Sequence, residues 1–270
     1  MRFRLLIPAL VAFSILAILS LRHAHAAGTA ARQAIDDTSR APVLVELFTS
    51  EGCSSCPPAD ALLERLDRSQ PVNGTELIVL SEHVDYWNDI GWKDPFSSHE
   101  YSERQSAYAG HFGLGSIYTP QMVVDGHIEL VGSDARRAIQ AVESATNAAK
   151  TQLSLSEIRF DGADKVSLHL EAGPLPSSVS AKSANLFLAI ADDSDESHVS
   201  RGENAGRTLK HVAVLRELVP VGTVGRTDRF SRDITVRLSN RTQGSLRILA
   251  IIQEPAVGRV LGVGLARISN

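Results

Sequence analysis

The stretch Val45-Glu-Leu-Phe-Thr-Ser-Glu-Gly-Cys-Ser-Ser-Cys-Pro-Pro-Ala-Asp60 decides the fold of the first half of the chain. It begins inside an apolar, β-branched run from Pro42 to Thr49, which is typical of a strand buried on both faces. From Ser54 the pattern becomes helical, with apolar residues on one stripe and two prolines in the first turn. The stretch therefore predicts a buried strand that leads into a Cys-x-x-Cys motif at the start of a helix.

Further elements follow this stretch up to residue 150. Leu77–Ser81 is typical of a second buried strand, and 97–111 of a helix capped by Ser97 or Ser98. The runs 121–124 and 127–131 flank Asp125-Gly126, a strong turn signal, and predict a hairpin. A last helix is expected from a Ser133 cap to about Lys150. This order of elements is that of a thioredoxin-type α/β unit, and we predict such a domain over 42–150.

The pattern changes after residue 151. Short alternating runs, separated by Gly, Pro, Asp and Asn, are typical of an all-β sandwich or barrel. The runs are 152–160, 165–170, 185–191, 211–218, 233–238, 246–253 and 259–268. They predict a β-sandwich-like C-terminal domain over 151–270.

The first 26 residues have the three parts of a secretory signal. Arg2 and Arg4 precede an apolar run, and Ala24-His-Ala26 places small residues where a signal peptidase reads. The alternative is a membrane anchor, but the run is at the short edge of what spans a bilayer. We predict cleavage near Ala26, a flexible leader over 27–41, and a periplasmic or secreted protein with no membrane partner.

Charge and cysteine content limit the function. Loss of three arginines with the signal would change the formal charge from −4 to −7, and no basic run offers a footprint for nucleic acid. The chain has two cysteines, Cys53 and Cys56, which will tend to pair in an oxidising compartment. A bridge across two residues constrains little of the unfolded chain. The cysteine pair is therefore more typical of a reactive site than of a stabilising disulfide.

Three interpretations of the Cys-x-x-Cys motif stay open. At a helix N-terminus the dipole and unpaired N–H groups stabilise a thiolate, which favours redox chemistry. In that case we expect the Cys53 sulfur to face solvent and Cys56, one turn inside, to be buried. Half of a zinc site looks the same, but zinc needs two more ligands and the chain has no second Cys pair and no His-x-x-x-His pair. An inert disulfide is the third. We predict no cofactor and no resident metal.

The quoted stretch resembles the active-site strand and helix of the thioredoxin superfamily. Four further motifs resemble those of a bacterial secreted family known as domain of unknown function 1223. They are His83-Val-Asp-Tyr-Trp87, Gly91-Trp-Lys-Asp-Pro95, Tyr118-Thr-Pro-Gln121 and Arg201-Gly-Glu-Asn-Ala-Gly-Arg-Thr-Leu209. The resemblance covers nearly all of the mature chain. It implies a thioredoxin-like N-terminal domain and a β-rich C-terminal one.

The thioredoxin resemblance also implies a cis proline opposite the cysteines. Thr119-Pro120, before the strand at Gln121, matches that position. Pro120 and the backbone of Thr119 would face a bound peptide, with Cys53 as the attacking sulfur and Cys56 as the resolving one. The alternative is an ordinary trans proline before a strand.

Several residues are candidates for supporting roles. His83 and Asp85 follow a strand parallel to the cysteine strand, so they either assist the cysteines or hold the inserted loop. Trp87 is either loop core or a substrate platform. Glu46 lies one place from the buried acid of thioredoxins, or pairs with a nearby Arg or Lys. Glu51 is expected to be exposed and, if close, to oppose thiolate formation at Cys53.

These observations predict thiol–disulfide exchange on exported proteins, with protein thiols or disulfides and a redox partner as the interacting molecules. Oxidant, isomerase and reductant stay open, because small differences in thiolate stability set the direction. One alternative is a non-enzymatic binding module on a thioredoxin scaffold. Another is copper handling by the Cys pair with His83.

Overall fold

A computed structural model describes residues 40–162, 164–238 and 244–269 of the chain. Residues Ala41–Asn270 form one compact unit. The predicted signal segment and residues 27–39 of the leader lie outside the described residues. Among the described helices, none has the length and apolar character needed to cross a membrane.

The elements up to residue 150 follow the predicted order. They are β1 (Ala41–Thr49), α2 (Pro57–Ser69), β2 (Thr75–His83), α3 (His99–Phe112), β3 (Gln121–Val124), β4 (Ile128–Val131) and α4 (Ala135–Ala145). Ser98 caps α3 as predicted. Asp125 and Gly126 adopt positive φ angles of 52° and 63°, which close the β3–β4 hairpin.

Two helix boundaries differ from the prediction. α2 begins at Pro57 and not at Ser54, because residues 53–56 form turns and Cys56 is the N-cap. The prolines then stand at the first helical positions, where a missing N–H group costs least. α4 is capped by Asp134 in place of Ser133, since its carboxylate accepts from the Arg137 N–H. It ends at Ala145, five residues earlier than expected.

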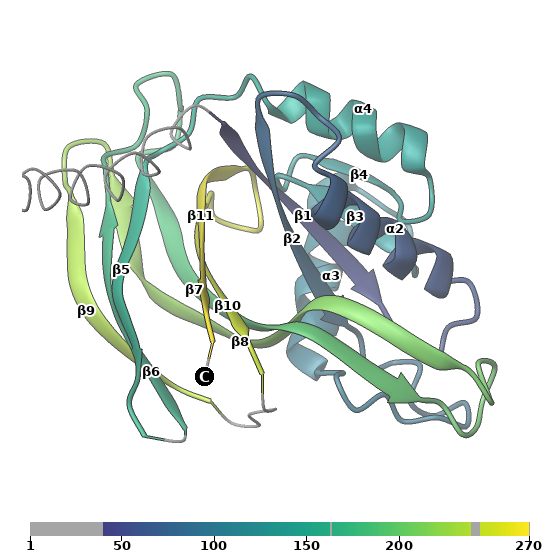
Figure 1. Cartoon of the computed structure of the whole chain (residues 1–270). Coiled ribbons are helices and arrows are strands. Elements are labelled where there is room, and N and C mark those ends of the chain that lie inside the picture. The colour runs from purple at the N-terminus through teal and green to yellow at the C-terminus, as the bar shows by residue number, and fades with distance from the viewer. Residues whose placement is uncertain (1–39, 163, 239–243, 270) are drawn as a thin grey trace, which may run out of the picture. The chain divides into compact units, whose positions relative to one another are not determined.

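Every predicted run after residue 151 coincides with a strand, although three of the runs extend one residue beyond its end. The strands are β5 (Leu153–Phe160), β6 (Lys165–Ala172), β7 (Ser183–His198), β8 (Thr208–Gly225), β9 (Phe230–Arg237), β10 (Leu246–Gln253) and β11 (Val260–Ile268). β7 and β8 are much longer than their predicted runs. Their paired ends, residues 194–198 and 208–212, and the loop 199–207 between them form a projection, here called the arm (Figure 1).

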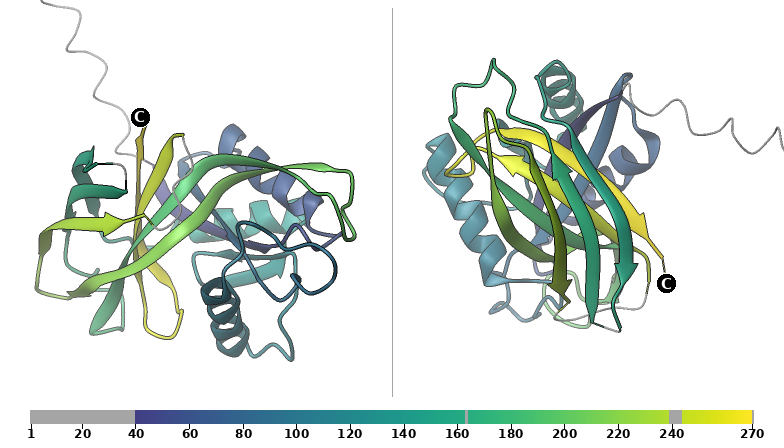
Figure 2. Two further views of the ribbon diagram at one scale, coloured as in Figure 1. Left: turned by 90° about the horizontal axis from the view of Figure 1, so that it is seen from below. Right: turned by 90° about the vertical axis from the view of Figure 1, so that its left-hand side faces the viewer.

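The strands of both halves of the chain share one sheet. Its order is β11-β10-β7-β8-β2-β1-β3-β4, with β2 and β8 parallel at Ser81 and Val214. β5, β6 and β9 form a second, antiparallel sheet. A core cluster joins this sheet to β7, β8, β10 and β11 (Figure 2). The β-sandwich expectation is met only in part, because one layer of the sandwich continues into the α/β half. The division at residue 150 into two domains stays a prediction.

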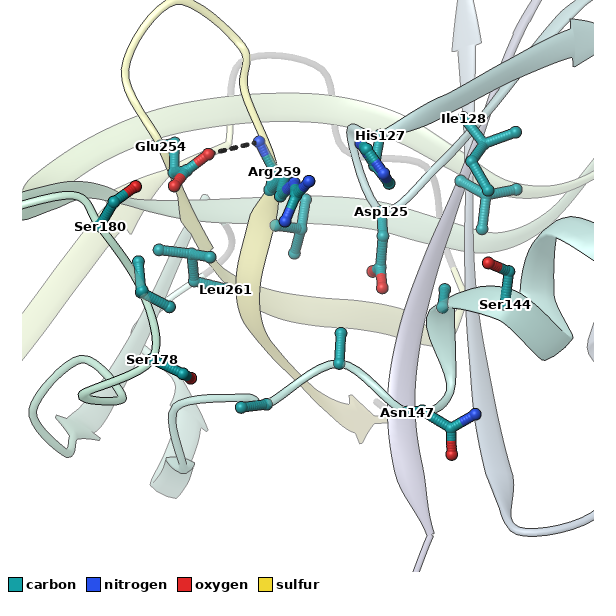
Figure 3. A pocket seen from close by; sticks show the side chains of 16 residues that line it. Asp125, His127, Ile128, Ser144, Asn147, Ser178, Ser180, Glu254, Arg259 and Leu261 are labelled. Atoms are coloured by element: carbon teal, nitrogen blue, oxygen red, sulfur yellow. Dashed lines mark hydrogen bonds between the residues drawn. The ribbon is translucent and has the colours of Figure 1, made fainter.

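A cavity lies away from the cysteines, between the β3–β4 turn, the end of α4 and the β10–β11 turn (Figure 3). It measures about 740 Å³. Asp125 on its wall bonds to the ammonium group of Lys150 at 2.6 Å and accepts from the Leu44 N–H. Burial and the charges of Arg259 and His111 lower the pKa of His127, another lining residue.

Candidate functional site

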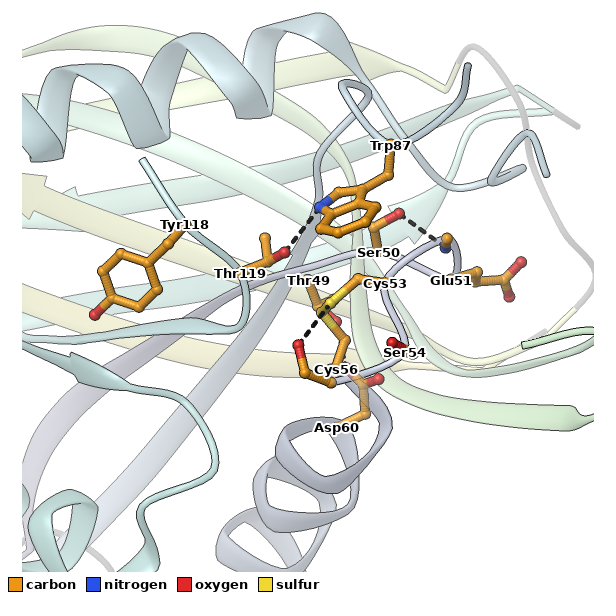
Figure 4. The surroundings of a disulfide bond; sticks show 12 residues. Thr49, Ser50, Glu51, Cys53, Ser54, Cys56, Asp60, Trp87, Tyr118 and Thr119 are labelled. Carbon is orange, nitrogen blue, oxygen red and sulfur yellow. Dashed lines mark hydrogen bonds between the residues drawn. A yellow bond between two sulfur atoms is a disulfide. The ribbon is translucent and has the colours of Figure 1, made fainter. Parts of the chain in front are cut away.

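Cys53 and Cys56 form a disulfide where β1 ends and α2 begins (Figure 4). Neither residue is exposed to solvent, whereas Ser54 and Ser55 between them are. The Ser55 Oγ lies 3.3 Å from the Cys53 Sγ. The expectation that Cys56 is buried is confirmed, and the expectation that Cys53 faces solvent is wrong. Cys53 lies in the turn before α2, and the segments packed around this turn enclose it.

Trp87 and Thr119 lie beside the disulfide (Figure 4). The Trp87 Nε1–H donates to the Thr119 Oγ1 at 2.8 Å, and the Thr119–Pro120 bond is cis, as predicted. A Cβ atom on Gly52 would approach the Trp87 Cβ to 3.0 Å, so the segment that carries Trp87 packs tightly on the cysteine turn. The half-buried Trp87 packs against a core cluster that includes Phe48 and Val84, and its role as a substrate platform stays a prediction.

A buried polar cluster lies next to the cysteine turn. The His83 Nδ1 bonds to the Asp94 Oδ2 at 2.7 Å, and the His211 Nε2 lies 3.2 Å from the Glu51 Oε1. The two imidazole rings are 4.6 Å apart, edge to face. Asp94 also accepts from the Glu51 N–H and therefore links His83 to the cysteine turn.

Glu51 differs from its sequence-based expectation. It is wholly buried, not exposed. Its carboxylate accepts hydrogen bonds from the Trp92 Nε1–H at 2.7 Å and from the Ser197 hydroxyl group. The long-range approach of β8 and the arm encloses Glu51, and no local pattern in the sequence shows this.

The pKa values of the ionisable groups in the cluster are shifted in different directions. Burial disfavours the charged form of His83, but the attraction and hydrogen bond of Asp94 outweigh it, so the pKa of His83 is raised. Burial likewise opposes ionisation of Asp94, but His83 and two backbone N–H groups hold its pKa low. Burial raises the pKa of Asp60, and the nearby His211 and His83 offset only part of this effect.

Asp60 is the acid one helical turn after Cys56 on α2. Its N–H donates to the Cys56 carbonyl at 3.1 Å, and its Oδ1 accepts from the Thr49 hydroxyl at 2.8 Å. Figure 4 shows its carboxyl group just below the disulfide. The His211 Nδ1, which has no hydrogen-bond partner among the described residues, lies 3.9 Å from Asp60 Oδ2. Asp60 also lines a surface pocket of 280 Å³.

The arm loop, residues 199–207, contacts the cysteine turn. The buried Asn204 donates from Nδ2 to the Glu51 carbonyl at 2.9 Å and to the Cys53 carbonyl at 3.0 Å. The Glu203 Oε2 accepts from the Ser54 N–H at 3.0 Å. Sequence reasoning singled out this Gly-rich stretch without assigning these contacts.

Two candidates lie outside the cysteine cluster. Glu46 accepts from the Arg104 Nε at 3.0 Å and from the Tyr108 hydroxyl at 2.6 Å, so the ion-pair alternative describes it. Asp85 bonds to Ser102 at 2.5 Å and to His99 of α3. In the part of the chain that the structure describes, neither carboxylate bonds to the cysteine turn.

Sequence reasoning missed Asp60, His211, Glu203 and Asn204 as residues of this site. Asp60 had a local signal, because it stands four residues after Cys56 and helical spacing places it on the same face. His211 comes from β8 and the other two from the loop before it, and pairing across more than 140 residues leaves no local pattern. Over the described ranges, no group of three or more His, Cys, Asp or Glu residues is arranged to hold a metal ion.

Two solved structures share the fold of the chain. Protein AGR_C_4864 from Agrobacterium tumefaciens is 23% identical with a TM-score of 0.63, and the match covers 85% of this chain and 95% of that one. HBP35 of Porphyromonas gingivalis is 14% identical with a TM-score of 0.62, over 86% of this chain and 76% of that one. No curated protein matches the sequence.

A family profile matches residues 44–253, which include the cysteines, the polar cluster and the arm. The chain therefore belongs to the family described as "Protein of unknown function (DUF1223)".

Proposed function

We propose that this chain performs thiol–disulfide exchange on exported proteins through Cys53 and Cys56, on a thioredoxin-like α/β core. The observation that carries the proposal is the disulfide itself, closed across two residues at the junction of β1 and α2 and next to buried ionisable groups. The parallel β1–β2 pair, the antiparallel β1–β3 pair and the helix after the cysteines support the thioredoxin-like interpretation.

The exchange is balanced without a cofactor. A partner thiolate attacks the Cys53 Sγ, the Cys53–Cys56 bond breaks, and Cys56 leaves as a thiolate that takes up a proton. A second partner thiolate attacks the partner's own sulfur in the mixed disulfide, and Cys53 leaves. The partner loses two electrons and gains a disulfide, while this chain gains two thiols. The reverse sequence reduces a partner disulfide.

Asp60 has the position to exchange a proton with Cys56. It is held by Thr49, lies one turn beyond Cys56, and lines a pocket that leads to the surface. Its burial raises its pKa and thus brings it nearer to that of a thiol than an ordinary carboxyl group would be. His211 beside it stabilises the carboxylate form.

A trapping experiment tests the proposal. Cys56→Ser removes the resolving sulfur, so the remaining thiol of Cys53 should form a stable mixed disulfide with a peptide disulfide, visible by mass spectrometry. Cys53→Ser is the matched control, and it should form far less adduct. Equal, slow adduct formation by both variants would contradict the proposal.

One observation favours a second function. Both cysteines are wholly buried, which suits an inert disulfide in a non-enzymatic binding module. In that case neither variant would react faster than an ordinary buried thiol, and removal of the disulfide would affect stability alone.

A further inference from the structure

The tip of the arm stands out because hydrogen bonds from Glu203 and Asn204 fasten it to the cysteine turn. Most residues of the loop 199–207 are exposed, apart from Val199 and Asn204. Gly202 and Gly206 adopt positive φ angles of 76° and 80°, so the backbone turns there without strain. Segments with few buried apolar contacts open more readily than the core.

Asn204 fastens the loop at two points of the turn. Its side-chain N–H groups donate to the carbonyls of Glu51 and Cys53, and its Oδ1 accepts from the Arg207 Nη1 at 2.7 Å. Its side chain is wholly buried. As long as these bonds hold, the backbone on both sides of Cys53 is fixed to the arm.

Glu203 acts on the electrostatics of the same turn. Its carboxylate occupies the Ser54 N–H, one residue after Cys53. Hydrogen bonding to the side chain and to the N–H group of Ser54 lowers the pKa of Glu203, so its negative charge is present at neutral pH. N–H groups at this junction are the donors that would stabilise a Cys53 thiolate, and a nearby carboxylate opposes that thiolate.

We propose that the loop 199–207 is an autoinhibitory clasp over Cys53, which a partner must displace before exchange. The displacing partner is an extended polypeptide segment that offers an acceptor to the Ser54 N–H and a donor to the Cys53 carbonyl. This role as a regulator rests on the proposed exchange function. The effect of the clasp on the rate of disulfide reduction can be measured without any exchange activity.

The first test measures how fast a small phosphine reductant opens the Cys53–Cys56 disulfide in the full chain. Asn204→Ala removes both bonds to the turn and should raise the rate by about tenfold, the scale expected for losing one to two net hydrogen bonds. Arg201→Gln, an exposed position on the same loop, is the matched control and should leave the rate unchanged. Equal rates for wild type and a folded Asn204→Ala would overturn the clasp.

The second test uses a variant on the surface, which should fold. Glu203→Gln keeps the size of the side chain but removes its charge, so the pH midpoint for alkylation of reduced Cys53 should fall. The other ionisable groups around the cysteines, Glu51, Asp60, His83, Asp94 and His211, are the same in both proteins. An unchanged or raised midpoint would overturn the role of Glu203.

Different experimental results would contradict the clasp and the exchange function. Faster reduction of Asn204→Ala by phosphine, without any exchange with peptide dithiols, would support the clasp and contradict the proposed function. Rapid exchange by wild type, with no gain in Asn204→Ala, would support the function and overturn the clasp.

Discussion

At the scale of single residues, buried charges hold the strands next to the site. Arg104 of α3 reaches Glu46 on β1 at 2.5 Å and lies 3.5 Å from Glu82 on β2. Burial raises the pKa of Glu82 well above its ordinary range, with partial compensation from Arg104. One guanidinium group therefore forms ion pairs with two buried carboxyl groups.

Replacement of Arg104 should destabilise the fold strongly. Arg104→Met leaves Glu46 without its ionic partner, and breaking a buried pair in this way costs about 3–5 kcal/mol. Urea unfolding at pH 7 measures the loss. Arg68→Met removes an exposed pair with Glu64 and should change the unfolding free energy by about 0.5 kcal/mol or less. Similar small effects of both variants would contradict the assigned role of Arg104.

The His83–Asp94 pair predicts a pH dependence of stability. The pKa of His83 is raised above 6.5, so its stabilisation is complete below pH 6.5 and is lost as the pH rises through the folded-state value. The pKa of Asp94 is lowered from 3.8, so its contribution is lost only as the pH falls through its folded-state value. Together these shifts predict that the pair stabilises the fold most between the folded-state pKa of Asp94 and that of His83.

Asp94→Asn tests this pH dependence. The variant should lose roughly 2–4 kcal/mol of unfolding free energy at about pH 6, and clearly less once the pH exceeds the folded-state pKa of His83, where this imidazole is neutral in the wild type as well. Asp89→Asn, an exposed position in the same loop, is the control. A penalty that does not change between the two pH values would refute the charged pair.

At the scale of elements, local chemistry made most of the fold predictable. The Asp125-Gly126 turn, the Ser98 cap and the alternating runs of the C-terminal half all act over a few residues, and all are present. The start of α2 differs from the prediction, because the apolar stripe begins inside the helix and the two prolines after Cys56 set where the helix starts. Periodicity marks a face of a helix and leaves its ends open.

The β3–β4 turn yields a prediction of its own. Gly126 has a φ of 63°, and a Cβ atom there would lie 2.2 Å from the Gly258 carbonyl oxygen of the β10–β11 turn. Gly126→Ala should therefore cost more than about 1 kcal/mol in thermal or urea unfolding. Gly110→Ala on the exposed side of α3 meets no atom within 4 Å and should be neutral or stabilising. A neutral Gly126→Ala would contradict the close approach.

At the scale of the whole molecule, β8 joins the two halves of the sheet. Leu44, Ile78 and Leu80 from β1 and β2 share a core cluster with residues of β7, β8, β10 and β11. The same pairing brings His211 to the cysteine turn and carries the arm over it. None of this was predictable, because contacts between distant segments leave no periodicity in either one.

Truncation tests how far the halves depend on each other. A fragment of residues 41–150 exposes the side of β2 that β8 covers and removes three of the partners of Glu51, namely Ser197, Asn204 and His211. We expect it to lack a cooperative unfolding transition and to bind a hydrophobic dye, in contrast to the 41–270 chain. A fragment that unfolds as cooperatively as the longer chain would instead support an independent N-terminal domain.

The exchange reaction itself is the most direct measurement. The oxidised chain is mixed with a reduced dithiol peptide, quenched with acid, and both products are weighed by mass spectrometry. We expect the chain to gain two hydrogens as the peptide loses two, faster with Asn204→Ala, and we expect Cys53→Ser to abolish the transfer. A disulfide that takes no electrons from the peptide, even in a folded Asn204→Ala variant, would contradict the proposed exchange.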